Sequence, residues 1–175
     1  MLDPNLAPEW RTTQWFNAPA PLSLTQLRGR VVFVTAFQML CPGCVSQGLP
    51  QALRVHEAFG KDDVAVVGLH TVFEHHEAMT PVSLEAFLHE YRIGFPVGVD
   101  APDTAGGAPA TMRAYAMRGT PTTLLIDREG RLRRHAFGHL PDLQLGAELM
   151  ALVGEGASTA PAALASGVCT PSGCS

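Results

Sequence analysis

The chain has 175 residues, 46% of them hydrophobic, and its formal net charge is −4. A chain of this length allows one domain, and its composition excludes the charge-rich, apolar-poor class of disordered proteins. A single lysine and scattered arginines form no basic stripe, so we expect no nucleic-acid partner. No apolar run reaches the ~18 residues that a membrane helix needs, so we expect no membrane partner either.

The first half of the chain alternates between strand and helix patterns after a Pro-rich lead-in at residues 1–20. Residues 31–37 form a nearly continuous run of β-branched and aromatic side chains, which is typical of a strand buried on both faces. A helix is predicted over 42–59 and a second buried strand over 64–69. Ser83 is the predicted N-cap of the next helix, whose apolar face has i, i+3, i+4, i+7 spacing: Leu84, Phe87, Leu88 and Tyr91.

The second half continues this alternation and ends in a stretch of small residues. The predicted elements are a strand at 95–99, a helix at 109–117, strands at 122–127 and 132–137, and a helix at 141–153. Alternating strands and helices predict an α/β fold, in which the last two strands add an antiparallel edge. The domain is therefore expected to span residues 21–153, and residues 154–175 are predicted to form a flexible tail.

A Cys-x-x-Cys motif, Cys41-Pro42-Gly43-Cys44, follows the first predicted strand and opens a helix. Pro42 suits the first helical position, which makes Cys41 the N-cap. The Cys41 sulfur then faces free backbone N–H groups and the positive end of the helix dipole, so it is expected to ionise readily. Cys44 lies three residues on, on the same face, and can close a disulfide. A structural half-zinc site would need a second ligand pair, so the spacing favours redox chemistry.

A second signal is Thr120-Pro121, which directly precedes the predicted strand at 122–127. A proline in a β context is tolerated at strand starts, edges or bulges, and an X–Pro bond can be cis at modest cost. On its own, this pair is better explained as an ordinary trans proline that begins a strand.

Together, PLSLTQLRGRVVFVTAFQMLCPGC (21–44) and GTPTTLLIDREGRL (119–132) resemble the redoxin branch of the thioredoxin superfamily, above all the bacterial TlpA/ResA-like disulfide reductases. The resemblance covers roughly residues 20–153 and implies a thioredoxin-like fold, with a central mixed β-sheet flanked by helices. It implies electron exchange with protein or small disulfides, without a cofactor. Cys41 would be the nucleophile and Cys44 the resolving thiol. Pro121 would be a cis-proline beside them, and Thr120 would offer backbone pairing to a substrate.

The chain departs from this family pattern at three positions. Leu40 stands before the first cysteine, where the branch usually has Trp, and Thr35 stands where many thioredoxins carry a buried Asp. Pro50 comes one residue later than the family spacing, and a π-bulge or a register change can absorb such an extra residue. We expect Leu40 and Pro42 to contact substrate; Met39 and Leu40 form either an apolar docking rim or plain core packing.

Other polar residues are weaker candidates for a functional site. A cluster before the second helix has metal-ligand chemistry or forms a solvated or substrate-facing loop: His70, Glu74, His75, His76 and Glu77. Neighbouring histidines cannot both face one site on a regular element, so we assign no metal here. Three further residues are expected at the surface or have no predicted place: Glu57, His135 and His139.

Two other functions stay open beside thiol–disulfide exchange. A peroxiredoxin-like peroxidase would resemble a Pro-x-x-x-Thr/Ser-x-x-Cys signature, but Cys41 is preceded in this register by Val34 and Gln38. Cys44 fits no better, because Phe37 and Cys41 occupy the two signature positions before it. A non-catalytic metal-binding module would hold a soft ion through the two thiolates and a histidine.

The expected partners are a disulfide-containing protein substrate and an upstream thiol reductant. The N-terminal residues lack the basic start and apolar run of a secretory signal, which favours a cytoplasmic location; a periplasmic location is expected if a leader has been removed. Cytosolic cysteines are normally kept reduced, so four cysteines in two close pairs indicate redox or metal chemistry rather than a structural disulfide framework.

The tail carries a second close pair, Cys169 and Cys174, after a linker of small residues at 154–167. As a flexible coil this linker spans about 20 Å, which is enough to reach across a small domain. We hypothesise that the pair relays electrons to or from Cys41–Cys44; a metal clip or no role are the alternatives. Truncation after Gly156 is then expected to lower disulfide reductase turnover. Unchanged rates with small and protein substrates, and no crosslink between the two pairs during partial oxidation, would contradict the relay.

Overall fold

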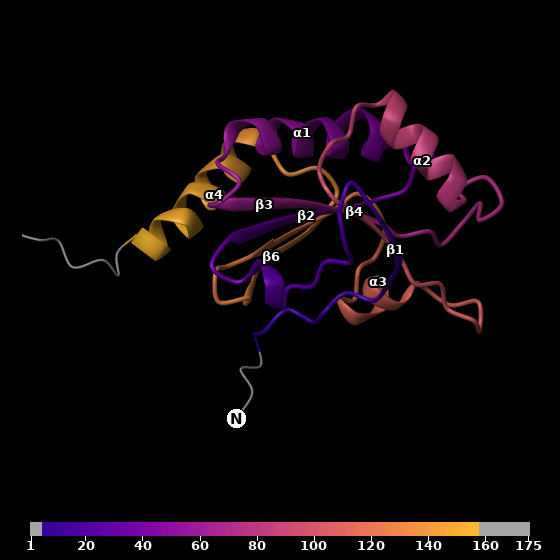
Figure 1. The fold of residues 1–175 in the computed structure, drawn as a ribbon, viewed down its shortest axis with the longest axis horizontal. Helices are drawn as coiled ribbons and strands as arrows, with labels where there is room; N and C mark the ends of the chain where they lie inside the picture. Colours follow the sequence, from indigo (N-terminus) through magenta and orange to yellow (C-terminus); the bar gives the residue numbers. More distant parts are fainter. Residues whose placement is uncertain (1–4, 158–175) are drawn as a thin grey trace, which may run out of the picture.

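The computed structural model describes residues 5–157, which contain six strands and four α-helices around one sheet (Figure 1). The strands are β1 (Thr12–Phe16), β2 (Val31–Phe37), β3 (Val64–His70), β4 (Val97–Asp100), β5 (Thr122–Ile126) and β6 (Leu132–Phe137). The α-helices are α1 (Leu49–Ala58), α2 (Pro81–Glu90), α3 (Ala110–Ala114) and α4 (Asp142–Ala157). Two short helical turns complete the fold: the 3-10 turn η1 (Thr25–Leu27) and the π-helical turn η2 (Cys44–Gly48).

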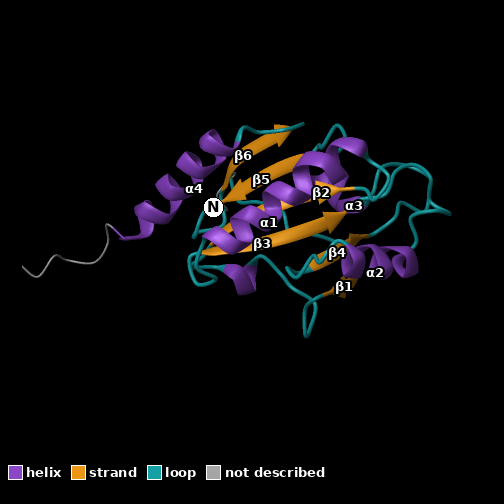
Figure 2. Ribbon diagram, turned by 90° about the horizontal axis from the view of Figure 1, so that it is seen from above, coloured by secondary structure: helices purple, strands orange, loops and turns teal. Residues whose placement is uncertain are grey.

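The sheet is mixed and has the strand order β1-β4-β3-β2-β5-β6 (Figure 2). β2, β3 and β4 run parallel, while β5 pairs antiparallel with β2 and β6 with β5. Every residue of β2 is buried, as its continuous apolar run predicts, because helices cover both faces of the sheet at its centre. The expected thioredoxin-like fold is confirmed.

Two apolar layers sandwich the sheet and fix its position. On one face, α1, α2 and α4 bury leucines against β2 and β3, including Leu49, Leu84 and Leu149. On the other face, η1 and α3 pack with N-terminal residues such as Trp10 against the alternate side chains of the same strands. Figure 1 shows the same division, with α1 and α2 above the sheet and α3 below it. No helix among residues 5–157 is long and apolar enough to cross a membrane.

The structure corrects the sequence-based expectations at three places. The lead-in contributes β1, an antiparallel edge strand on β4; the sequence did not predict it, because its burial does not alternate regularly. The N-cap of α2 is Thr80 rather than Ser83: the Thr80 hydroxyl accepts the N–H of Ser83, and Pro81 takes the first helical position. Helix α4 continues to Ala157, beyond the predicted end at residue 153.

His70 ends β3 as a buried imidazole. Its side chain is 1% exposed, its two ring nitrogens have no hydrogen-bond partner in the described residues, and its ring lies 5.3 Å from that of Phe37. Burial lowers the pKa of His70 to about 4, because the apolar surroundings disfavour the charged ring. A folded-state pKa below the unfolded value makes the folded state bind fewer protons at acidic pH, so stability falls there.

We therefore expect the free energy of unfolding to decrease as the pH falls from about 6.5 to 4, by on the order of 3 kcal/mol from His70 alone. Above about pH 6.5 the histidine is neutral in both states, and this contribution to the pH dependence vanishes. Denaturant titrations at several pH values measure it. His70→Leu should flatten the dependence, whereas the exposed-residue control His135→Gln should keep it. Equal slopes in the wild type and His70→Leu would contradict this account.

Candidate active site

The cysteine motif lies where β2 ends and a helix begins. The backbone N–H of Cys41 donates to the carbonyl of Gln38 (3.2 Å), which turns the chain after β2. The backbone N–H of Cys44 then donates to the sulfur of Cys41 (3.2 Å), and Val45 N–H donates to the Cys41 carbonyl (3.1 Å). Cys41 is therefore the N-cap, as predicted, and a helix N-terminus stabilises negative charge on its sulfur.

The two cysteines differ sharply in environment. Cys41 is half-buried, whereas Cys44 is fully buried in the apolar layer below it. Burial, followed by the hydrogen bond with Cys41, raises the pKa of the Cys44 thiol to about 12. The partly exposed Cys41 sulfur is thus the one that a substrate can reach, and the buried Cys44 thiol stays protonated near neutral pH.

The helix that carries the motif contains one extra residue. The π-helical turn η2 spans Cys44–Gly48 and passes directly into α1, so the late position of Pro50 is absorbed as a π-bulge. This turn approaches the Pro121 loop closely: a Cβ on Gly48 would lie 3.1 Å from the Pro121 Cβ, and one on Gly43 3.4 Å from its Cδ. Only the distance at Gly48 is tighter than an ordinary contact, so this glycine is the one that lets the helix approach the proline.

The Thr120–Pro121 peptide bond is cis, which confirms the prediction for this pair. The carbonyl of Thr120 lies 3.5 Å from the Cys41 sulfur and accepts its thiol hydrogen. Pro121 is buried while Thr120 is partly exposed, so the backbone of Thr120 borders the reactive sulfur on its open side.

The residues on either side of Cys41 have different surroundings. Leu40 is 57% exposed and Pro42 is exposed, so both are available to a substrate, whereas Met39 is buried in the core. The docking-rim interpretation thus fits Leu40, and the core-packing interpretation fits Met39. Thr35, at the position of the thioredoxin Asp, is buried in β2 and supplies a hydroxyl instead of a carboxylate.

The polar cluster predicted before α2 does not come together. His70 lies in the core, while the other members are exposed on the following loop: Glu74, His75, His76 and Glu77. Within residues 5–157, no group of three or more His, Cys, Asp or Glu side chains is arranged to hold a metal ion. Glu57, His135 and His139 are exposed, and Cys169 and Cys174 lie outside the described residues.

Sequence reasoning missed two buried polar residues that position the site. The Gln38 side chain, 1% exposed, accepts the N–H of Phe73 (3.2 Å) and donates to Glu74 (3.3 Å), which ties the approach to Cys41 to the loop after β3. Asp100 accepts the N–H of Thr111 (2.7 Å) at the start of α3, the helix that leads into the Thr120 loop. A polar residue directly at the end of a buried strand was the available signal for both.

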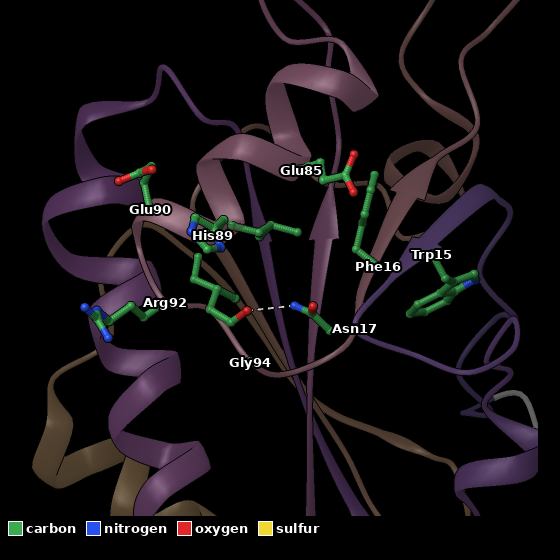
Figure 3. A pocket seen from close by; sticks show the side chains of 10 residues that line it. Trp15, Phe16, Asn17, Glu85, His89, Glu90, Arg92 and Gly94 are labelled. Atoms are coloured by element: carbon green, nitrogen blue, oxygen red, sulfur yellow. Dashed lines mark hydrogen bonds between the residues drawn. The ribbon is translucent and has the colours of Figure 1, made fainter.

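A sizeable pocket among the described residues lies away from the cysteines. It has a volume of about 760 Å³ and is bordered by the end of β1 and by α2, as Figure 3 shows. Asn17 closes one side of this pocket by donating to the carbonyl of Ile93 (2.7 Å). The pocket is lined by side chains of both charge signs, including Glu85 and Arg92. Thiol chemistry needs an accessible sulfur rather than an enclosed cavity, so we place the candidate active site at the cysteine pair.

Comparisons with known proteins agree with this fold. Residues 5–135 match the AhpC/TSA family. The chain is 62% identical to a thioredoxin-like superfamily protein of known crystal structure, over 85% of this chain and 96% of the other, with a TM-score of 0.83. It is 46% identical to a thiol-disulfide isomerase from Corynebacterium glutamicum, over 87% of this chain and 98% of the other, also with a TM-score of 0.83.

A more distant relative is the thiol-disulfide oxidoreductase ResA of Geobacillus thermodenitrificans, which is 24% identical over 66% of this chain. The match spans only 59% of that relative's length. The family match covers most of the chain, and the redoxin resemblance read from the motif segments points to the same group. The chain therefore belongs to the AhpC/TSA family, as a TlpA/ResA-like member of the thioredoxin superfamily.

Proposed function

We propose that this protein is a thiol-disulfide oxidoreductase that exchanges electrons with disulfide substrates through Cys41 and Cys44. The observation that carries the proposal is the setting of the Cys41 sulfur, which accepts the Cys44 N–H at 3.2 Å and lies 3.5 Å from the Thr120 carbonyl beside cis-Pro121. The names of the thiol-disulfide isomerase and oxidoreductase relatives support the same reaction class.

The first step uses the exposed cysteine. The Cys41 thiolate attacks one sulfur of a substrate disulfide, so a Cys41–substrate disulfide forms, the substrate S–S bond breaks, and the second substrate sulfur leaves as a thiolate. The N–H of Cys44 and the helix N-terminus favour the attacking anion. Exposed Leu40 and the backbone of Thr120 are the groups that a bound substrate would contact on the two sides of the sulfur.

The second step uses the buried cysteine. Cys44 gives up its proton and attacks the Cys41 sulfur, which forms the Cys41–Cys44 disulfide and releases the remaining substrate sulfur as a thiol. Two electrons have then passed from the protein to the substrate. An upstream thiol reductant returns two electrons to the pair, and in a cytoplasmic location, which is part of this proposal, the cellular thiol pool is such a source.

Substitution of each cysteine separately tests their roles. Cys44→Ser should accumulate a mixed disulfide with a disulfide substrate, because Cys41 still attacks but nothing resolves the product. Cys41→Ser should form none, because Cys44 is fully buried and burial raises the pKa of its thiol. Non-reducing gels and intact-protein mass spectrometry measure the adducts.

Alkylation of the reduced wild type provides the control. Iodoacetamide near neutral pH should label Cys41 well before Cys44, since Cys44 is fully buried. Labelling of Cys44 first, or trapping by Cys41→Ser instead of Cys44→Ser, would reverse the roles assigned to the two residues.

The response to peroxide separates this function from that of a peroxidase. Neither cysteine has the peroxidatic signature before it, so hydrogen peroxide should oxidise the reduced protein only as fast as an ordinary reactive thiol. Stopped-flow measurement of tryptophan fluorescence or of thiol loss gives the rate, with Cys41→Ser as the matched control. A rate several orders of magnitude above that of free thiols would show that the protein is a peroxidase.

A further inference from the structure

Arg118 and Phe137 form an exposed pair that the proposed reaction does not yet use. The Arg118 guanidinium carbon lies 5.4 Å from the centre of the Phe137 ring, over its face. Arg118 is exposed and Phe137 is 50% exposed, so a large apolar ring and a cation are both presented to solvent. Stacking on an aromatic face orders the guanidinium while leaving its N–H edge free to bind a planar anion.

The backbone links this pair to the loop that contacts the Cys41 sulfur. Phe137 packs against Gly119 so closely that a Cβ there would lie 2.9 Å from its ring. Gly119 directly precedes Thr120, whose carbonyl contacts the Cys41 sulfur. On the other side, the N–H of Gly138 donates to the carbonyl of Pro121 (2.8 Å), which holds the end of β6 against the same loop.

The charge of Arg118 is uncompensated in the described part of the chain. The neighbouring β6 arginines are both neutralised, Arg133 by Glu155 at 2.6 Å and Arg134 by Glu148. Arg113 of α3 pairs with Asp103 at 2.6 Å. No acidic side chain among residues 5–157 forms an ion pair with Arg118. A chain with a net charge of −4 thus keeps an unpaired cation two residues before Thr120, whose carbonyl contacts the Cys41 sulfur.

We propose that Arg118, held on Phe137, selects protein substrates that carry an acidic residue close to the disulfide cysteine. A carboxylate can form a bidentate pair with the free guanidinium edge, and its neighbouring apolar atoms can cover the Phe137 ring. Exposed Leu40 then contacts the substrate beyond Cys41. This inference rests on the proposed function and names the substrate class of that site.

The test uses disulfide peptides of equal length whose residues beside the cysteine are glutamate, glutamine or lysine. The full-length protein is first reduced and then mixed with each peptide in a single turnover. Each rate is divided by the rate for a small neutral disulfide, bis(2-hydroxyethyl) disulfide, so a general change in Cys41 reactivity cancels. We expect the glutamate peptide to react about three to ten times faster than the lysine peptide at low salt. This ratio should shrink towards one near 1 M salt.

Variants assign the preference to its source. Arg118→Gln should bring the glutamate-to-lysine ratio close to one, and Arg118→Lys should retain part of it because the charge remains. Phe137→Leu should reduce the ratio, since the guanidinium loses its aromatic support. The matched control is Arg11→Gln, which removes an exposed arginine whose side chain has no ion pair among residues 5–157 and should keep the wild-type ratio.

A binding measurement separates this inference from the reaction itself. Peptides with serine in place of cysteine are titrated into isotope-labelled protein, and the amide shifts of residues 118–120 and 137–138 are followed by NMR. The glutamate peptide should shift these signals in the wild type and not in Arg118→Gln. If the protein reduced no disulfide, the proposed function would be overturned. The titration would still show whether the Arg118–Phe137 surface binds the glutamate peptide. The inference would be overturned if the wild type reduced the glutamate and lysine peptides at equal normalised rates and both serine peptides shifted the same signals equally.

Discussion

The contact between Pro121 and the start of the cysteine-bearing helix is the constraint on which the site depends. β2 and β5 are antiparallel neighbours, so the last residues of β2 and the first residues of β5 lie side by side at the same end of the sheet. Gly48 lets the helix approach the proline, because a Cβ there would already lie 3.1 Å from Pro121. Helix register, loop position and the Thr120 carbonyl are therefore set together, and the Cys41 sulfur lies between them.

The difference in burial between the two cysteines follows from the same arrangement. The N-cap position places Cys41 outside the first helical turn, at the rim of the sheet, and three residues later the chain has turned inward. Cys44 then packs with Phe37 and Leu49 in the apolar layer, where desolvation raises the pKa of its thiol. One turn of helix thus separates the accessible Cys41 sulfur from the buried, protonated Cys44 thiol. This difference suits a reaction in which Cys41 attacks the substrate first and Cys44 reacts second.

Much of this fold could be predicted from local pattern, and the failures have physical causes. The run at Val31–Phe37 is apolar on both faces, so its burial and central place were readable. β1 was not readable, because an edge strand pairs on one side only and none of its residues is fully buried. The π-turn η2 was anticipated only as one way to absorb an extra residue before Pro50; choosing it over a register shift required the contact with Pro121.

The same distinction applies to the site. Spacing and chemistry make three motif residues predictable from sequence: Cys41, Cys44 and Pro121. Thiol exchange is favoured by two close sulfurs at a helix start. Arg118 and Phe137 carry no such signal: they are 19 positions apart and meet only because β6 returns beside β5 and brings its last residue over Gly119. Reaction type is thus encoded locally, within one strand–helix junction, whereas the surface that a partner meets is assembled by topology.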